Sequence, residues 1–399
     1  MDKLIPRPYF LNNLIRFREA DVIKVVTGVR RSGKSTLFEL YIEYLKSEGV
    51  DESRIIHVNL EDIGMEHLHG YKALHDFLIS KLHSGKMTYI FIDEVGRCAE
   101  FEKAVDSIYI RKNTDVYITG SNADLLSGEL ATLLSGRYIE IKMLPFSFAE
   151  FYEANKNEDK NAAFMDYLNI GSFPVVVTRL GSDMELADQY LEGIYNTIII
   201  KDVASRKGIG DVGLLKNIVK YLCGNIGSPI STANITGYIN STGRKITQKT
   251  VDKYVKALED SFLFYSVDRY DIKGKNLLKT LGKYYIVDTG LRNHLLSSSN
   301  SDVGHQIENI VFLELVRRGY RVNVGKAGDK EIDFVATKQN AREYYQVSIS
   351  ALDESVSERE LAPLRKVGDN YPKYLLTLDF ITSDYDGIKQ INLIDWLLE

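Results

Sequence analysis

Short apolar runs alternate with amphipathic stretches along the first 145 residues of the chain. The apolar runs have the length of strands and comprise residues 22–27, 55–60, 88–92, 116–119 and 138–141. The stretches between them repeat apolar residues at helical spacing, for example in residues 35–47 and 71–82. Strands that alternate with helices are typical of a parallel sheet with helices on its faces. We therefore predict an α/β core in residues 1–145.

The pattern changes after Pro145. Residues 146–205 have helical spacing, interrupted by the turn-forming run Gly171-Ser172-Phe173-Pro174, and predict a helical lid. Residues 206–296 combine helices with strands. Residues 302–399, after a serine-rich linker, predict a second and smaller α/β domain. The chain is therefore expected to contain four parts.

The middle part, residues 206–296, has the pattern of a winged helix. Two of its three predicted helices, at 230–240 and 247–260, form a helix–turn–helix pair. The strand-like runs at 262–268 and 283–287 follow them in the place of a wing. The last part predicts helices and strands at 303–318, 321–324, 331–336, 344–349, 358–369 and 373–378.

Composition narrows the class of protein. The 399 residues are 44% hydrophobic and 26% charged, the balance of a soluble chain with sizeable cores. The net charge of −5 gives no global reason to expect nucleic acid or an acidic membrane as a partner. The two cysteines, Cys98 and Cys223, lack the spacing of a zinc site or a disulfide framework. No apolar run nears the ~18 residues of a membrane span, so we expect a cytoplasmic protein without membrane contact.

A phosphate-binding loop follows the first predicted strand. Residues 28–35 match the pattern GxxxxGK[ST], and they lie between a strand and a helix, where such a loop must lie. The candidate nucleotide-binding residues are Gly28, Val29, Arg30, Arg31, Ser32, Gly33, Lys34, Ser35 and Thr36. The glycines allow backbone N–H groups to point at phosphate oxygens, and the helix N-terminus adds a positive dipole. Lys34 would neutralise the β- and γ-phosphates, and the Ser35 hydroxyl would hold Mg²⁺.

Two acids end the strand-like run 88–92. Asp93 is expected to bind Mg²⁺ through water, facing Ser35, and Glu94 to polarise the attacking water. The next run ends in Ser121 and Asn122, either of which could sense the γ-phosphate. Arg137 precedes the fifth strand, where an arginine finger could touch the nucleotide of a neighbouring subunit. The alternative for Arg137 is a salt bridge or a cation at a helix C-terminus.

These motifs resemble those of the bacterial and archaeal AAA-type ATPases that carry a C-terminal domain of unknown function. The resemblance covers nearly the whole chain and rests on residues 27–35, 59–62, 91–94, 119–121, 135–138, 144–148, 171–174 and 331–335. The resemblance implies a parallel sheet of the AAA type whose phosphate loop uses ATP. The N-terminal motifs are specific for this use of ATP. The cellular role of the family is poorly defined.

A basic stretch lies within the winged-helix part. From Ser241 to Lys283 there are ten Lys and Arg and five Asp and Glu, a local net charge of 10 − 5 = +5. The second helix of the pair carries Lys249, Lys253 and Lys256. Such a patch could neutralise the phosphates of duplex DNA. Winged helices also serve as protein contacts, and both alternatives stay open.

The C-terminal part is similar to a restriction-endonuclease-like fold. Sites of that kind need a helix acid, a strand Asp and a following acid-x-Lys, which together hold Mg²⁺. Glu308 and Asp333 fill the first two places, but the third reads Gln346-Val347-Ser348. Gln346 occupies the place of the acid but lacks its negative charge. Ser348 occupies the place of the lysine and cannot replace its ammonium group. A degenerate binding or scaffold domain is therefore favoured over an active nuclease.

The sequence thus predicts an ATPase that uses ATP and Mg²⁺, with a P-loop core, a helical lid, a winged-helix module and a degenerate nuclease-like domain. Its cycle would serve a remodelling or switching task, which the basic stretch suggests is related to DNA. A homo-oligomer would allow Arg137 to act between subunits. The alternatives are a nucleotide-gated switch, a DNA-binding regulator gated by ATP and an ATP-dependent nuclease.

Overall fold

The computed structural model describes residues 4–123, 136–155, 158–181, 183–296 and 302–399 of the chain. It divides into two compact units. The first unit comprises Met1–Met143 with Asp260–Phe262, and the second comprises Leu144–Glu259 with Leu263–Glu399. Within the described residues, no helix has both the length and the apolar character needed to cross a lipid bilayer.

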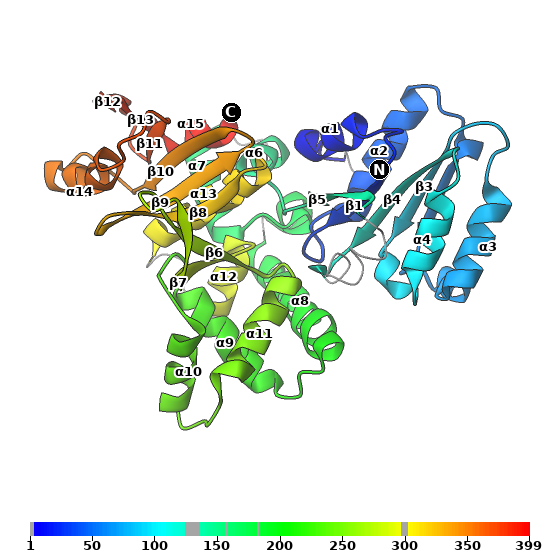
Figure 1. Cartoon of the computed structure of the whole chain (residues 1–399), viewed down its shortest axis with the longest axis horizontal. Coiled ribbons are helices and arrows are strands. Elements are labelled where there is room, and N and C mark those ends of the chain that lie inside the picture. The colour runs from blue at the N-terminus through cyan, green and yellow to red at the C-terminus, as the bar shows by residue number, and fades with distance from the viewer. Residues whose placement is uncertain (1–3, 124–135, 156–157, 182, 297–301) are drawn as a thin grey trace. The chain divides into compact units, whose positions relative to one another are not determined.

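The first unit is built on a parallel five-stranded sheet (Figure 1). Its strands are β1 (Ile23–Thr27), β2 (Ile55–Asn59), β3 (Thr88–Asp93), β4 (Thr114–Gly120) and β5 (Tyr138–Lys142). They lie in the order β2-β3-β4-β1-β5, and every neighbouring pair is parallel. All residues of β1 and β3 are buried, as continuous apolar runs in a sheet covered on both faces require. The predicted α/β fold with a P-loop type sheet is confirmed.

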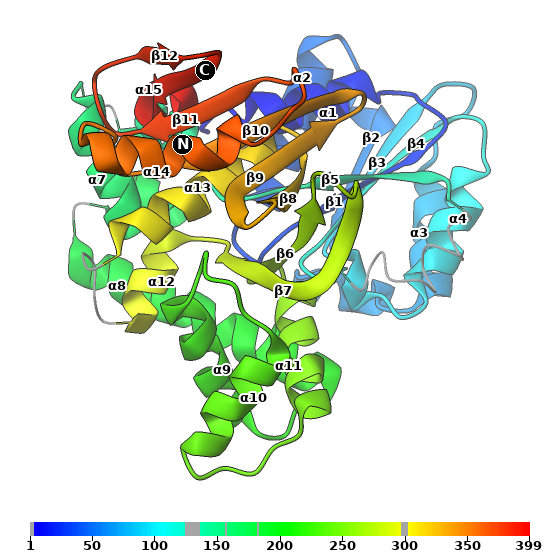
Figure 2. The same ribbon diagram turned by 60° about the vertical axis from the view of Figure 1, so that its left-hand side comes forward.

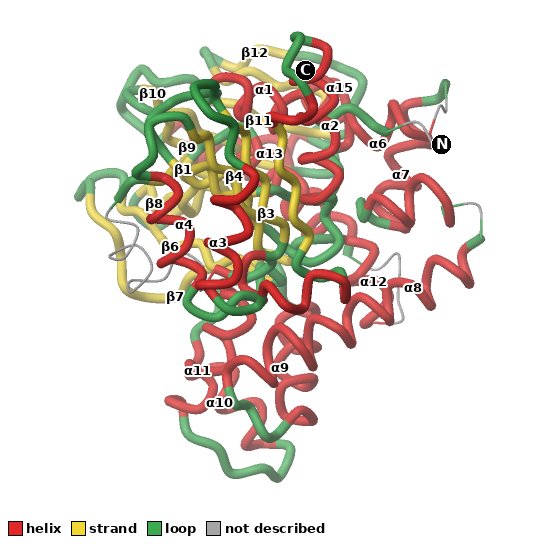
Figure 3. The backbone as a smooth tube through the Cα atoms, turned by 90° about the vertical axis from the view of Figure 1, so that its right-hand side faces the viewer, coloured by secondary structure: helices red, strands yellow, loops and turns green. Residues whose placement is uncertain are grey.

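Helices cover both faces of this sheet (Figures 1 and 3). One apolar core packs α1 (Pro8–Arg16) and α2 (Lys34–Ser47) against the sheet through Phe10, Phe38 and Tyr41. The other packs α3 (Tyr71–Lys81) and α4 (Phe101–Tyr109) against the opposite face through Leu78 and Val105. Short 3₁₀ turns connect the elements at η1 (Glu52–Arg54), η2 (Ile63–Leu68) and η3 (Val95–Arg97).

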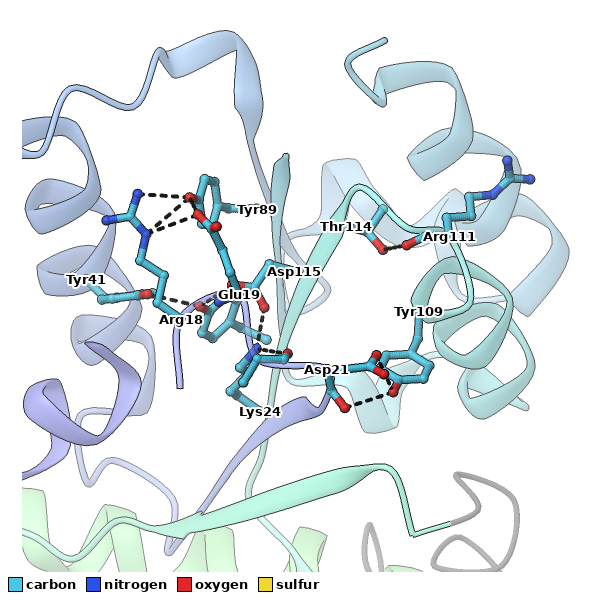
Figure 4. A network of polar contacts seen from close by, with 12 residues as sticks. Arg18, Glu19, Asp21, Lys24, Tyr41, Tyr89, Tyr109, Arg111, Thr114 and Asp115 are labelled. Carbon is cyan, nitrogen blue, oxygen red and sulfur yellow. Dashed lines mark hydrogen bonds and ion pairs between the residues drawn. The ribbon is translucent and has the colours of Figure 1, made fainter. Parts of the chain in front are cut away.

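A buried ion pair joins two adjacent strands of the first sheet (Figure 4). Lys24 of β1 is paired with Asp115 of β4, and the two side chains are 0% and 1% exposed. Asp115 also accepts hydrogen bonds from the Glu19 N–H at 2.8 Å and the Tyr117 hydroxyl at 2.7 Å. Burial lowers the pKa of Lys24, although the charge of Asp115 opposes that shift. The sheet therefore carries a charged pair whose members depend on each other.

The second unit begins with helices (Figure 2). They are α6 (Phe148–Asn155), α7 (Lys160–Ile170), the π-helical turns η5 (Val176–Leu180) and η6 (Ile198–Ser205), α8 (Met184–Thr197), α9 (Val212–Gly224), α10 (Thr232–Ser241) and α11 (Gln248–Asp260). The later helices are α12 (Thr289–Leu296), α13 (Val303–Arg317), α14 (Glu354–Arg365) and α15 (Leu393–Leu398). Sequence patterns had not indicated α12 or α15.

An eight-stranded mixed sheet completes the second unit. Its strands are β6 (Phe264–Asp271), β7 (Asn276–Ile286), β8 (Arg321–Ala327), β9 (Lys330–Lys338), β10 (Ala341–Val347), β11 (Lys373–Thr377), β12 (Ser383–Tyr385) and β13 (Ile388–Asn392). The order is β12-β13-β11-β10-β9-β8-β6-β7. The strands expected as a wing, β6 and β7, are thus continuous with the C-terminal sheet. The backbone of β6 pairs with β8, so the hydrogen-bonding groups on that edge of β6 have partners. In a separate two-stranded wing they would be unpaired.

The motif Gly171-Ser172-Phe173-Pro174 ends α7 in a tight polar turn. Buried Asp288 accepts hydrogen bonds from the Ser172 N–H at 2.6 Å and the Ser172 hydroxyl at 2.7 Å. Gly171 has φ +79°, and a Cβ there would lie 2.4 Å from the Asp288 carboxylate. A Cβ at Gly290 would lie 2.2 Å from the Ile170 carbonyl oxygen. These glycines therefore allow two segments of the second unit to approach closely.

Candidate nucleotide site

The phosphate loop lies where β1 ends and α2 begins, at the carboxyl edge of the first sheet. Gly33 has φ +96° in the left-handed region and directly precedes α2. Gly28 has φ +150°, and a Cβ there would lie 2.1 Å from the Met143 carbonyl oxygen. The loop therefore needs glycine at both ends. Gly33 allows the left-handed backbone conformation, and Gly28 allows the backbone at Met143 to approach closely.

Lys34 is turned back onto the loop. Its ammonium is buried and donates hydrogen bonds to the carbonyl oxygens of Gly28 at 2.9 Å and Val29 at 3.1 Å. The Ser32 hydroxyl is buried and has no hydrogen-bond partner among the described residues. A buried hydroxyl without a partner costs free energy, and a phosphate oxygen would satisfy it. The loop therefore fits a phosphate group.

Asp93 is the last residue of β3 and Glu94 follows it, at the same edge of the sheet. Asp93 is buried and accepts a hydrogen bond from the Thr119 hydroxyl. Glu94 has φ +50°, and its backbone N–H donates to the Thr119 oxygen at 2.8 Å. The hydroxyl of Ser35, in the first turn of α2, and the Asp93 carboxylate are oxygen ligands of the kind that Mg²⁺ prefers.

Ser121 contacts Glu94 directly. Its hydroxyl donates to the Glu94 Oε1 at 2.6 Å, and both residues are buried. Asn122, the next residue, is fully buried at the same strand end. Sequence reasoning placed Ser121 at the nucleotide, and the geometry adds that it holds the carboxylate of Glu94. The end of β4 therefore fixes both acids that follow β3.

Arg137 lies at the opposite edge of the sheet. It precedes β5, whose first residue, Tyr138, is paired with Ile23 at the start of β1. Its guanidinium lies 3.7 Å from the Asp106 carboxylate and 5.8 Å from the centre of the Tyr109 ring. The fold does not bring Arg137 to the phosphate loop of its own chain. Ser135, in the segment 135–138 that carries part of the family resemblance, lies outside the described residues.

Two arginines make further contacts at the loop, of which sequence reasoning had indicated Arg30 and missed Arg7. Arg7, buried before α1, donates from its guanidinium to the Ser32 carbonyl oxygen at 3.1 Å. Arg30 within the loop contacts Glu61, with 2.9 Å between Nη1 and Oε1. Burial opposes ionisation of Glu61, but Arg30 and Arg97 outweigh it and lower its pKa. No local motif marks Arg7, because its contact depends on how α1 packs.

The chain is 40% identical to an uncharacterized protein of Haemophilus influenzae over 403 residues, covering 99% of both chains. The two proteins belong to one family. An uncharacterized protein of Methanocaldococcus jannaschii is 29% identical and covers 94% of this chain and 85% of its own. Residues 20–152 match the model of an AAA domain, and residues 161–302 match a domain of unknown function, DUF8612.

The chain shares its fold with a solved P-loop ATPase. The Walker-type ATPase of Pyrococcus abyssi superposes with a TM-score of 0.53, covering 73% of this chain and 95% of its own, at 15% identity. The AAA match begins before β1 and ends within α6, so it includes the phosphate loop and both acids after β3. The candidate nucleotide site therefore lies in an AAA-type domain.

A second polar centre lies in the second unit. Lys283 of β7 is 4% exposed, and its Nζ lies 2.9 Å from Glu308, 3.0 Å from Glu331 and 3.6 Å from Asp333. We call these four residues the lysine–carboxylate cluster. The fold thus brings Glu308 and Asp333 together, as predicted. Sequence reasoning had assigned Lys283 to the exposed basic stretch, which is wrong because its side chain is buried.

The charges of the cluster are coupled. Burial alone would lower the pKa of Lys283, but the Glu308, Asp333 and Glu331 carboxylates outweigh it and raise that pKa. Burial raises the pKa of Asp333, the charge of Glu308 adds to the shift, and Lys283 opposes it. Gln346, the third predicted site residue, donates to Glu360 at 2.9 Å. Lys283 of β7 thus places an ammonium beside Glu308 and Asp333, whereas Ser348 carries none.

The remaining basic stretch is also partly neutralised. Arg244 lies 3.0 Å from Asp211, and Arg269 lies 3.5 Å from Glu331. Lys249 and Lys253 are exposed on α11. The local charge of +5 therefore overstates the positive surface of this segment, although Lys245, Lys273 and Lys275 are exposed in addition to the lysines of α11.

Proposed function

We propose that the chain binds ATP at the phosphate loop and hydrolyses it to ADP and phosphate. The observation that carries this proposal is the position of Glu94. This residue is buried, comes directly after β3, and accepts a hydrogen bond from the Ser121 hydroxyl at 2.6 Å. A carboxylate fixed in that position is suited to accept a proton from water. A site built only to bind nucleotide has no need of it.

Each residue at the site has a distinct role in this proposal. The loop amides and Lys34 bind the phosphates, for which Lys34 exchanges its bonds to the Gly28 and Val29 carbonyls for phosphate oxygens. Ser35 and Asp93 would hold Mg²⁺, and the ion would neutralise negative charge on the phosphates. Glu94 orients a water and takes its proton as the water oxygen bonds to the γ-phosphorus, and the bond from that phosphorus to the ADP oxygen breaks.

Substitution of Lys34 tests the binding step. Lys34→Ala is expected to abolish ATP binding, measured by fluorescence of a labelled ATP analogue. Lys46→Ala is the matched control, because Lys46 lies in the same helix α2 and is exposed. Equal affinity in both variants would contradict the role of Lys34 and of the loop.

Arg137 is proposed to act on the nucleotide of a neighbouring copy. Its position at the opposite edge of the sheet from its own phosphate loop favours a role between subunits over a role in its own site. Turnover per chain should then rise with protein concentration, and mixing Arg137→Ala chains with Lys34→Ala chains should restore activity. A concentration-independent rate would contradict this role.

Duplex DNA is a second candidate partner, because Lys249 and Lys253 are exposed along α11. Lysines on one exposed helix can neutralise phosphates in a salt-dependent way. Replacing both with Glu should weaken duplex binding at low salt. Absence of duplex binding by the wild-type protein would remove this candidate.

A further inference from the structure

A groove of about 230 Å³ lies on the sheet of the second unit, apart from the sites described above. Its polar lining comes from β6, β8, β9, β10 and the turn between β6 and β7. These residues are Tyr270, Lys275, Arg321, Asn323, Thr337 and Arg342. We call this feature the arginine groove. Three of its residues are cations and none is an acid.

The strand register places the two arginines on one face of the sheet. Arg321 of β8 is paired with Thr337 of β9, and Thr337 is paired with Arg342 of β10. Directly paired residues point their side chains to the same face. Strands lie about 4.8 Å apart, so the two arginine backbones are separated by about 10 Å across Thr337. Side chains of that length can reach the same ligand.

The cations of the arginine groove lack acidic partners. Among the described residues, no carboxylate lies within ion-pair distance of Lys275, Arg321 or Arg342. Converging cations repel each other, and an anion that binds between them would relieve that repulsion. This contrasts with Lys283 and Arg269 on neighbouring strands, which are both paired with Glu331.

Aromatic rings hold Arg342 in place. Its guanidinium donates to the Tyr270 hydroxyl at 3.1 Å and lies 5.2 Å from the centre of that ring. The Tyr371 ring centre lies 5.6 Å from the same guanidinium, and Tyr371 is 42% exposed. A preorganised arginine beside an exposed aromatic ring is suited to bind a phosphate and to stack the base next to it.

We propose that the arginine groove binds the backbone of a single-stranded nucleic acid. Arg321, Arg342 and Lys275 contact phosphates, and Tyr371 stacks on an unpaired base. The volume favours a segment of a polymer, because pockets for whole small ligands hold roughly 300–1,000 Å³ and this groove is smaller. The exposed ring favours single strands, because the bases of a duplex are already stacked. The inference does not depend on ATP hydrolysis.

The test is fluorescence anisotropy of a labelled 15-nucleotide oligo(dT), with the full chain and no added nucleotide. We expect binding at 50 mM salt and about a tenfold or greater loss in Arg321→Glu, a charge reversal at an exposed position. In Arg321→Glu/Arg342→Gln, the slope of log affinity against log salt should shrink by about 1.4, or about 0.7 for each lost contact. Thermal melts of each variant verify folding.

Two controls separate this groove from other surfaces. Lys389→Glu makes the same charge change at an exposed position of β13 and should bind like wild type. Lys249→Glu/Lys253→Glu, on α11, should also retain oligo(dT) binding. The proposal is overturned if wild type does not bind, or if Arg321→Glu binds as Lys389→Glu does.

Discussion

The buried pair of Lys24 and Asp115 provides a test of how the first sheet is held together. Asp115→Asn keeps the shape of the side chain but removes the charge that faces Lys24. The Lys24 side chain is 0% exposed, so its ammonium cannot reach water. Its other bond is to the Ala20 carbonyl oxygen at 3.1 Å. Removing one member of a buried pair costs about 3–5 kcal/mol.

The reverse substitution should cost less. In Lys24→Met the Asp115 carboxylate keeps hydrogen bonds from the Glu19 N–H and the Tyr117 hydroxyl. A double variant, Lys24→Met/Asp115→Leu, removes both charges, and replacement of a buried pair by apolar residues is often neutral. We therefore expect the wild type and the double variant to be the most stable and similar to each other. Lys24→Met should be less stable, and Asp115→Asn should be the least stable.

Hydrogen exchange measured by mass spectrometry is the appropriate assay. The single tryptophan, Trp396, lies in the second unit, so its fluorescence does not report on this pair. A loss of 3 kcal/mol corresponds to about a hundredfold faster exchange in peptides from β1 and β4. Peptides from β10 and β11 in the second unit serve as an internal control. Unchanged protection of β1 and β4 in Asp115→Asn would refute the reasoning.

Three further predictions concern single positions. Gly28→Ala should lower ATP affinity by about tenfold or more, because its Cβ would meet the Met143 carbonyl oxygen at 2.1 Å; normal affinity in a binding titration would contradict this. Ser121→Ala should lower the rate constant of hydrolysis about tenfold with binding retained, since a hydrogen bond to a charged group contributes about 1.5–3 kcal/mol; an unchanged single-turnover rate would count against it. Burial raises the pKa of Cys98 to about 11 and of Cys223 to about 12. Neither thiol should therefore react with iodoacetamide at pH 8 until urea is added, and rapid native labelling would show that one is accessible.

The first unit was predictable because its information is local. Each strand of the parallel sheet is a short apolar run, and the phosphate loop is a contiguous motif with glycines at fixed positions. The acids Asp93 and Glu94 directly follow a buried strand, so their edge of the sheet follows from strand direction. The contact of Ser121 with Glu94 also follows from neighbouring strand ends, although its distance does not.

The second unit was less predictable because its contacts join distant segments. Lys283 lies in a stretch rich in Lys and Arg, and local charge indicated an exposed position. Its burial depends on pairing of β6 with β8, which brings β7 into the sheet that carries Asp333. A count of charges along the chain cannot detect such pairing. The register that aligns Arg321 with Arg342 is equally nonlocal.

The central claim, hydrolysis that depends on Glu94, is tested most directly by steady-state phosphate release together with ATP binding in Glu94→Gln. Glu39→Gln is the control, because Glu39 is exposed on α2 and the charge change is the same. We predict that Glu94→Gln binds ATP as the wild type does but releases phosphate at least about a hundredfold more slowly. Equal turnover in Glu94→Gln and Glu39→Gln would contradict the account.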